Sequence, residues 1–149
     1  MQKIIYSTGI LVVEDDPHDL ELTLRSISKC DPGIQTTIAR DGVEALEYLF
    51  GPNAEAIELV KNIPRLIIMD LKLPKVNGLE VIKRIKSHQT ARTIPIVVFS
   101  SSTQEEDILA AYRNGANSYL SKPVKYEEYS QIIMGATNYW LKQNQFIFV

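Results

Sequence analysis

The segment 66–78, LIIMDLKLPKVNG, constrains the fold more than any other part of the chain. It begins with four consecutive apolar residues, and a continuous apolar run indicates a strand that is covered on both faces. Such strands occur in parallel sheets with helices on either side, and these sheets bind ligands at the carboxyl ends of their strands. Asp70 follows the run directly. We therefore expect the chemistry of the protein at Asp70.

The rest of the chain repeats this pattern of short apolar strands followed by amphipathic helices. Besides 66–69, the segments expected as strands are 10–13, 36–39, 96–99 and 118–120. Apolar residues recur at helical spacing after Asp16-Pro17, Asp41, Asn77-Gly78 and Glu105, and again from about 127 to 142. The alternation of strands and helices predicts an α/β fold with a right-handed, doubly wound parallel sheet of five strands.

Length and charge fit one globular domain. The 149 residues suit a single domain over 1–149 that ends in a short apolar tail, 144–149. The connection 51–65 is longer than usual for α/β units, and 55–61 has the composition of a short extra helix. A net charge of −2 provides no basic face for nucleic acid, and no segment reaches the roughly 20 apolar residues of a membrane helix. We expect a cytoplasmic protein that binds neither nucleic acid nor membranes.

The polar side chains that could form a site follow four of the five predicted strands. They are Glu14, Asp15 and Asp16 after the first strand, Asp70 after the third, Ser100 after the fourth and Lys122 after the fifth. The carboxyl ends of parallel strands share one edge, so these side chains should lie together. Crowded carboxylates repel one another unless a cation neutralises them, and oxygen donors without histidine or thiol suit Mg²⁺. Asp16 is better explained as a helix cap, because Pro17 follows it.

A metal ion, a carboxylate, a hydroxyl and an ammonium at one edge are the groups that phosphoryl transfer requires. Asp70 stands alone at the end of the central strand, so one of its oxygens can coordinate metal while the other attacks phosphorus. Lys122 and Ser100 can each bind an oxygen of the transferred group. The sequence therefore predicts Asp70 as the nucleophile, with Lys122 and Ser100 as its catalytic partners.

These motifs resemble the receiver domains of two-component signalling, the response-regulator family with a flavodoxin-like fold. The resemblance covers nearly the whole chain, and its motifs are ILVVEDD with Glu14 and Asp15, LIIMDLKLP with Asp70, the following Pro74 and Gly78, PIVVFS with Ser100, and YLSKP with Tyr119, Lys122 and Pro123. It implies the strand order 2-1-3-4-5 and Mg²⁺-dependent transfer of a phosphoryl group to Asp70. The donor would be a histidine kinase or a phosphotransfer protein, and the output would be phosphorylation-dependent protein binding.

The resemblance also implies how the metal is held. Asp15 and Asp70 would bind Mg²⁺ directly, Glu14 would bind it through water, and Lys72 would contribute its backbone carbonyl. The protein would then be a phosphorylation switch that catalyses only its own phosphoryl transfer and dephosphorylation.

A second set of residues is expected to respond to phosphorylation. By resemblance, Ser100 would move to the phosphoryl group, Tyr119 would turn inward into the vacated space, and Lys122 would pair with the phosphate. The family usually has a cis peptide bond before Pro123.

Weaker features resemble receivers that partner phytochrome-type sensor kinases. These features are the long connection 51–65, the run of serines after Phe99 and the aromatic pair Tyr139-Trp140. They favour a kinase of that type as the partner. They also favour a homodimer, which could form through the last helix, the Tyr119 side or the apolar tail 146–149.

Three other functions fit the sequence less well. Haloacid-dehalogenase-type phosphatases also use an aspartyl nucleophile with Mg²⁺, but they need a second acid two residues on, where this chain has Lys72. A degenerate receiver that binds constitutively would not need the complete set of site residues. A flavodoxin-like cofactor protein needs a Gly-rich first loop, and here that loop is acidic.

Overall fold

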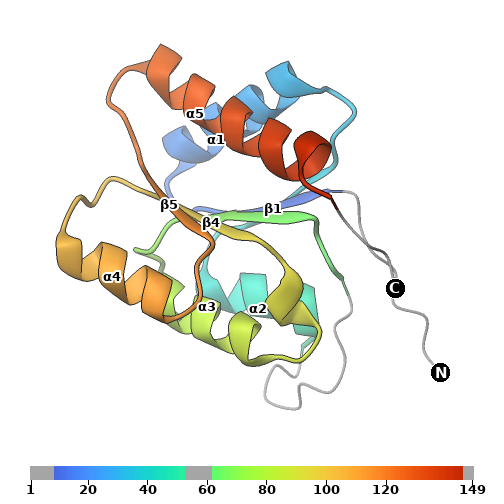
Figure 1. The fold of residues 1–149 in the computed structure, drawn as a ribbon, viewed down its shortest axis with the longest axis vertical. Coiled ribbons are helices and arrows are strands. Elements are labelled where there is room, and N and C mark those ends of the chain that lie inside the picture. The colour runs from blue at the N-terminus through green and yellow to red at the C-terminus, as the bar shows by residue number, and fades with distance from the viewer. Residues whose placement is uncertain (1–8, 53–61, 146–149) are drawn as a thin grey trace.

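A five-stranded parallel sheet forms the centre of the molecule (Figure 1). The structure is a computed structural model that describes residues 9–52 and 62–145. The strands are β1 (Ile10–Val13), β2 (Thr36–Ala39), β3 (Leu66–Met69), β4 (Ile96–Ser100) and β5 (Ser118–Ser121). Their order is β2-β1-β3-β4-β5, and all neighbouring pairs are parallel. The predicted α/β class and strand order are confirmed.

Helices cover both faces of this sheet. In Figure 1, α1 (Pro17–Cys30) and α5 (Tyr126–Asn138) lie on one face. The opposite face carries α2 (Gly42–Phe50), α3 (Gly78–Ser87) and α4 (Glu105–Arg113), with the short 3₁₀ helix η1 (Ala91–Thr93) before β4. A doubly wound sheet needs helices on both faces, because its strands expose apolar side chains on both.

The strands supply a separate apolar core to each helical layer. Side chains alternate across a strand, so neighbouring residues point to opposite faces. Ile67 and Met69 of β3 therefore pack toward α2, α3 and α4. Leu66 and Ile68 pack toward α1 and α5. Because all four are buried, the continuous apolar run before Asp70 is explained by this two-sided burial.

Side-chain caps begin three of the helices. The Asp16 carboxylate accepts hydrogen bonds from the backbone of His18 and Asp19, which confirms its role as the cap of α1. Asp41 and Asn77 cap α2 and α3 in the same way. Such caps satisfy backbone donors that have no partner within the helix. The caps therefore fix the positions at which these helices leave the edge of the sheet that carries the site.

The last helix differs from its predicted extent. A single helix to about 142 was expected, but α5 ends at Asn138 and a π-helical turn, η2 (Tyr139–Gln143), follows. The backbone N–H of Asn144 closes this wider turn on the carbonyl of Tyr139 at 2.7 Å. Helical periodicity alone cannot distinguish this turn from a continuing α-helix, because both present Trp140 to the core around α1 and α5.

Two expectations concern segments that lie outside the described residues. These are the short helix at 55–61 and the apolar tail at 146–149. Within residues 9–52 and 62–145, no helix is both long and apolar enough to cross a lipid bilayer.

The loop that follows Asp70 packs closely against the start of α2. A β-carbon on Gly42 would lie 2.0 Å from the carbonyl oxygen of Val76. Lys75, which has a positive φ of 66°, reaches Asp41 with its ammonium 3.3 Å from the carboxylate. The absence of a side chain at Gly42 thus allows the loop to approach α2.

We predict that Gly42→Ala lowers the free energy of unfolding by about 2 kcal/mol, because the added methyl group forces the backbone of the loop to move. Gly135→Ala is the matched control. It lies within α5, where an added β-carbon meets nothing within 4 Å, so it should raise the free energy of unfolding by up to about 1 kcal/mol. Urea unfolding of both variants provides the measurement. Equal effects of the two substitutions would contradict the proposed contact.

Candidate functional site

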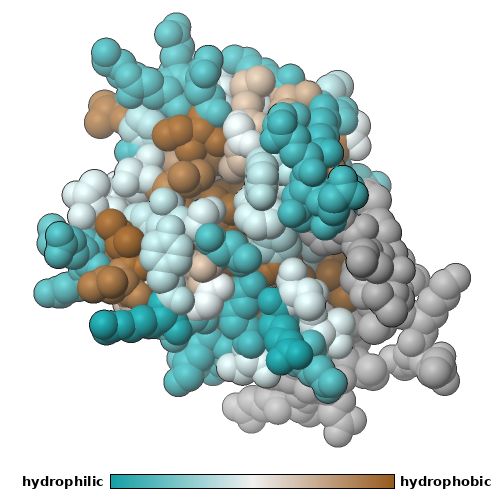
Figure 2. Space-filling view, viewed as in Figure 1, coloured by the Kyte–Doolittle hydropathy of each residue, from teal (hydrophilic) through white to brown (hydrophobic). Residues whose placement is uncertain are grey.

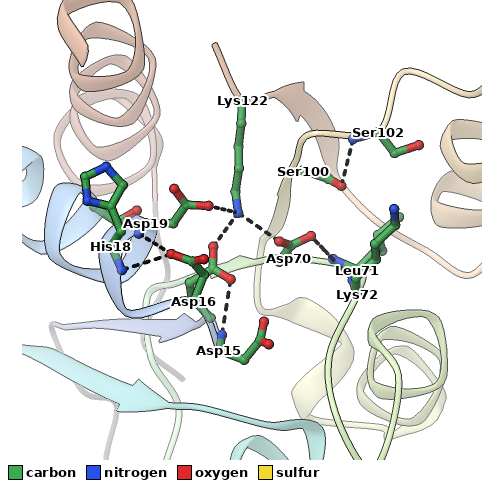
Figure 3. A network of polar contacts seen from close by, with 12 residues as sticks. Asp15, Asp16, His18, Asp19, Asp70, Leu71, Lys72, Ser100, Ser102 and Lys122 are labelled. Atoms are coloured by element: carbon green, nitrogen blue, oxygen red, sulfur yellow. Dashed lines mark hydrogen bonds and ion pairs between the residues drawn. The ribbon is translucent and has the colours of Figure 1, made fainter. Parts of the chain in front are cut away.

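The sheet brings the predicted site residues to one edge. Glu14 and Asp15 follow β1, and Asp70 follows β3, the neighbouring strand. Ser100 is the last residue of β4, and Lys122 comes directly after β5. Figure 3 shows the ammonium of Lys122 reaching back across this edge toward Asp70. Four strands therefore contribute to one site.

Lys122 is the centre of this arrangement. Its side chain is only 7% exposed, and its Nζ donates to a carboxylate oxygen of each of three acids. The distance from Nζ to Asp70 Oδ2 is 2.8 Å, and that to Asp19 Oδ2 is 3.0 Å. The third contact is with Oε1 of Glu14. All three hydrogens of the ammonium are used by carboxylates.

Asp19 is a member of the site that the sequence reasoning missed. It lies in the first turn of α1, and its carboxylate is 29% exposed. Acids are common in the first turn of any helix because they favour the positive end of the helix dipole. The sequence does contain one indication of this role. The first predicted helix begins at the same edge of the sheet as the other site residues, so an acid in its first turn can face them.

The two oxygens of Asp70 have different partners. Oδ2 accepts from Lys122, while Oδ1 accepts from the backbone N–H of Leu71 at 2.7 Å and from that of Lys72 at 3.4 Å. These contacts fix the orientation of the carboxylate, which is 13% exposed. One ordered carboxylate thus remains accessible at the end of the central strand.

Negative charge exceeds positive charge inside this site. Burial raises the pKa of Glu14 to about 7; the nearby Lys122 ammonium opposes the shift, and Asp70 and Asp19 add to it. Burial acts to lower the pKa of Lys122, but its hydrogen bonds and attraction to Asp70 and Glu14 outweigh burial and raise it. A single ammonium is therefore shared by several acids, and an additional cation would stabilise the site.

The donor set fits a hard divalent cation. Among the described residues, no group of three or more Asp, Glu, His or Cys side chains is arranged to hold a metal ion. Mg²⁺ does not require such a group, since it is typically bound by one or two carboxylates together with water and phosphate oxygens. Asp15 is exposed beside the buried Glu14, and Asp70 directly follows the adjacent strand β3. These carboxylates match the oxygen ligands that Mg²⁺ prefers.

The two residues predicted to respond to phosphorylation are connected through Ser102. Ser100 is buried, and its Oγ accepts from the backbone N–H of Ser102 at 3.2 Å. The Tyr119 hydroxyl donates to the carbonyl of Ser102 at 2.8 Å. The backbone N–H of Tyr119 in turn donates to the hydroxyl of Tyr112 on α4 at 3.2 Å. A movement at Ser100 can thus reach Tyr119 and α4 through one loop residue.

One expectation from the resemblance is wrong. The peptide bond between Lys122 and Pro123 is trans in this structure, as are all others in the described segments. Lys122 nevertheless reaches the acids, because its side chain extends back along the sheet edge from the end of β5.

The fold and this edge define a class of protein, a doubly wound α/β domain with an acidic site and a buried lysine at the carboxyl ends of its strands. Residues 10–134 match the family described as the response regulator receiver domain. The chain belongs to this family.

Similar proteins include a regulatory protein and two response regulators. The chain is 36% identical to the probable methanogenesis regulatory protein FilR2 of Methanothrix harundinacea, over 91% of this chain and 85% of that protein. The phosphorylated cyanobacterial phytochrome response regulator RcpA has a similar crystal structure, with a TM-score of 0.83 and 35% identity over 93% of this chain and 97% of RcpA. The Mn²⁺-bound form of Rcp1 of Synechocystis sp. has a TM-score of 0.81 and 30% identity, and the match covers 94% of this chain and 99% of Rcp1.

Proposed function

We propose that this receiver domain accepts a phosphoryl group on Asp70 and signals by phosphorylation-dependent protein binding. The observation that carries the proposal is the ordered Asp70 carboxylate, which is held by Lys122 and by the backbone of Leu71 beside further acids. A carboxylate oxygen of Asp70 forms the new bond to phosphorus as the bond from phosphorus to the donor breaks. The donor is a phosphorylated histidine of a sensor kinase or of a phosphotransfer protein.

Each neighbouring residue has a role in this transfer. Glu14, Asp15, Asp70 and the backbone carbonyl of Lys72 would hold Mg²⁺, which neutralises charge on the carboxylates and on the transferred group. Support for a divalent cation comes from the Mn²⁺-bound form of Rcp1. Lys122 lies within reach of Asp70 Oδ2, where it can bind an oxygen of the incoming group.

The switch residues would connect Asp70 to a binding surface. A phosphoryl group that bonds to the Ser100 hydroxyl would compete with its contact to Ser102. The backbone carbonyl of Ser102, in the loop after β4, also accepts a hydrogen bond from the Tyr119 hydroxyl. Phosphorylation would then shift an existing equilibrium between two arrangements of this loop, because one arrangement binds the phosphoryl group better.

The adjacent surface has apolar side chains that a protein partner could cover. Figure 2 shows apolar residues over α4 and between β5 and α5. Leu109 and Tyr112 on α4 are 51% and 48% exposed, and Val124 is fully exposed. We propose this Tyr119 side, the last helix or the tail 146–149 as the surface of a homodimer. The phytochrome response regulator RcpA supports a phytochrome-type kinase as the phosphodonor.

The site argues against an enzyme that hydrolyses external phosphate esters. Two residues after Asp70, where an aspartyl phosphatase has its acid, lies the exposed side chain of Lys72. A lysine ammonium is a much weaker acid than a carboxylic acid, so it is a poorer proton donor to a leaving alcohol. Self-catalysed transfer and dephosphorylation remain the chemistry of this edge.

Incubation with acetyl phosphate and Mg²⁺ should add one phosphoryl group to the protein, as measured by intact mass. Chelation of the metal with EDTA should abolish the adduct, because the carboxylates then repel the anionic donor. An unchanged mass with saturating donor and Mg²⁺ would contradict the proposed function. An equal adduct in EDTA would contradict the metal requirement.

A further inference from the structure

Asp19 lies outside the set of residues that the phosphoryl-transfer site requires, yet it contacts the central lysine. Its Oδ2 is 3.0 Å from Lys122 Nζ, almost as close as Asp70 Oδ2 at 2.8 Å. In Figure 3 the ammonium lies between Asp19 on the α1 side and Asp70 on the other. Lys122 is therefore shared between the proposed phosphoryl acceptor and an acid that is neither the acceptor nor a proposed metal ligand.

The backbone of Asp19 is firmly held. Its N–H donates to the Asp16 carboxylate at 2.9 Å, and its carbonyl accepts from the Tyr129 hydroxyl at 3.1 Å. The same hydroxyl lies 2.8 Å from that of Thr23, so α1 and α5 are joined at this point. A carboxylate on an immobilised backbone holds its partner in a defined place, because only the two torsions of the short aspartate side chain remain to be ordered.

We propose that Asp19 is a positioning residue that restrains Lys122 and thereby slows phosphorylation of Asp70. The inference rests on the proposed function of Asp70. In the transition state of transfer, negative charge is spread over the three equatorial oxygens of the phosphoryl group. Lys122 can stabilise the charge on these oxygens only when its ammonium moves away from the carboxylates that it now contacts. Attraction to Asp19 draws the ammonium toward α1 and uses one of its three hydrogens.

Asp19→Asn tests this restraint. The amide has the size of the carboxylate but no charge, so the attraction to Lys122 is weakened while the first turn of α1 is preserved. With acetyl phosphate and saturating Mg²⁺, the rate of adduct formation should rise roughly fivefold, the effect of one partly exposed ion pair. Asp19→Glu restores the charge and should return the rate toward that of the wild type. Asp19→Ser, also compatible with a first helical turn, provides a second neutral variant.

Asp16→Asn is the matched control for charge alone. Asp16 is an exposed acid on the same loop that caps α1, and its side-chain hydrogen bonds go to backbone N–H groups. An amide at that position keeps an oxygen for the cap. Loss of charge at Asp16 also reduces repulsion of the anionic donor, but it should change the rate less than twofold.

A spectroscopic measurement separates restraint from a general structural effect. The ¹⁵N resonance of the Lys122 ammonium should shift in Asp19→Asn and stay near its wild-type position in Asp16→Asn. A merely structural role of Asp19 would lower thermal stability without raising the rate.

The outcomes distinguish this inference from the proposed function. A wild-type protein that takes no phosphoryl group would overturn both. If the wild type is labelled, the inference alone is overturned when Asp19→Asn and Asp19→Ser are no faster than the wild type, or when Asp16→Asn accelerates labelling equally. A faster rate in both neutral Asp19 variants, with recovery in Asp19→Glu, would support it.

Discussion

Asp70→Asn is expected to abolish labelling by acetyl phosphate and Mg²⁺. Asparagine has the same size as aspartate, and its oxygen can still accept from the backbone of Leu71 as Oδ1 does now at 2.7 Å. The amide is not a nucleophile toward phosphorus, so the substitution removes the acceptor together with one negative charge that contacts Lys122. Intact-mass measurement under conditions that label the wild type completely gives the result.

The control for this substitution is again Asp16→Asn, which removes a carboxylate from the same edge but leaves Asp70 in place. It should be labelled to the wild-type extent. An adduct of the same mass in Asp70→Asn would mean that another residue accepts the phosphoryl group. Peptide mapping would then place it, with the other acids of the site, Glu14, Asp15 and Asp19, as the first to test.

The centre of the sheet could be predicted from sequence because β1, β3 and β4 are buried on both faces. The runs Ile10–Val13 and Leu66–Met69 contain only apolar residues, a pattern that few other structures produce. The first polar residue after a run then marks the carboxyl edge. For this reason the placement of Glu14, Asp70 and Ser100 at one edge followed from the chain alone.

Asp19 could not be identified in this way, because its role depends on a contact across 103 residues of sequence. In sequence it is an ordinary acid in the first turn of a helix. Only the packing of α1 against α5 places its carboxylate within reach of Lys122, which follows β5. Local patterns predict which elements form, whereas side-chain contacts between distant elements require their relative positions.

Two lysines illustrate the same limit. Lys86, on α3, resembles a surface lysine in sequence, yet its ammonium donates to the carbonyl of Ile94 at 2.7 Å and to Asn117 Oδ1 at 2.9 Å. Burial among these neutral acceptors lowers its pKa to about 8, whereas the acids around Lys122 raise the pKa of that lysine. Residue type and helical spacing do not distinguish these environments, because the partners lie on other elements.

Lys122→Met should cause the largest loss of stability among the substitutions considered. Methionine has a similar length but no charge, so the substitution leaves Glu14 and Asp70 without the ammonium that both now contact. Removal of one partner from a buried ion pair typically costs about 3–5 kcal/mol. We expect a loss of about 3 kcal/mol near neutral pH, measured by urea unfolding. Lys125→Met, at an exposed position three residues later, should change stability by less than about 0.5 kcal/mol.

The loss of stability in Lys122→Met should depend on pH, because Glu14 changes its protonation state near neutral pH. Its pKa in the folded protein is about 7, above the ordinary value of 4.5, so the folded state binds the proton more tightly than the unfolded state does. The resulting stabilisation is fully present below pH 4.5 and disappears as the pH rises through 7. Without Lys122 the pKa of Glu14 should rise further, because the ammonium no longer favours the carboxylate.

The difference between wild type and Lys122→Met should therefore be smallest near pH 5 and largest near pH 8. Mg²⁺ should recover part of it at pH 8, since a cation that binds only the folded protein stabilises that state. A difference that is independent of pH would contradict the assignment of the loss to uncompensated acids and would point to packing around Phe99, whose ring lies 6.0 Å from the ammonium. Asp19→Asn removes one of the acids that Lys122 neutralises. In the double variant, the loss of unfolding free energy caused by Lys122→Met should therefore be reduced, and by more at pH 8 than at pH 5.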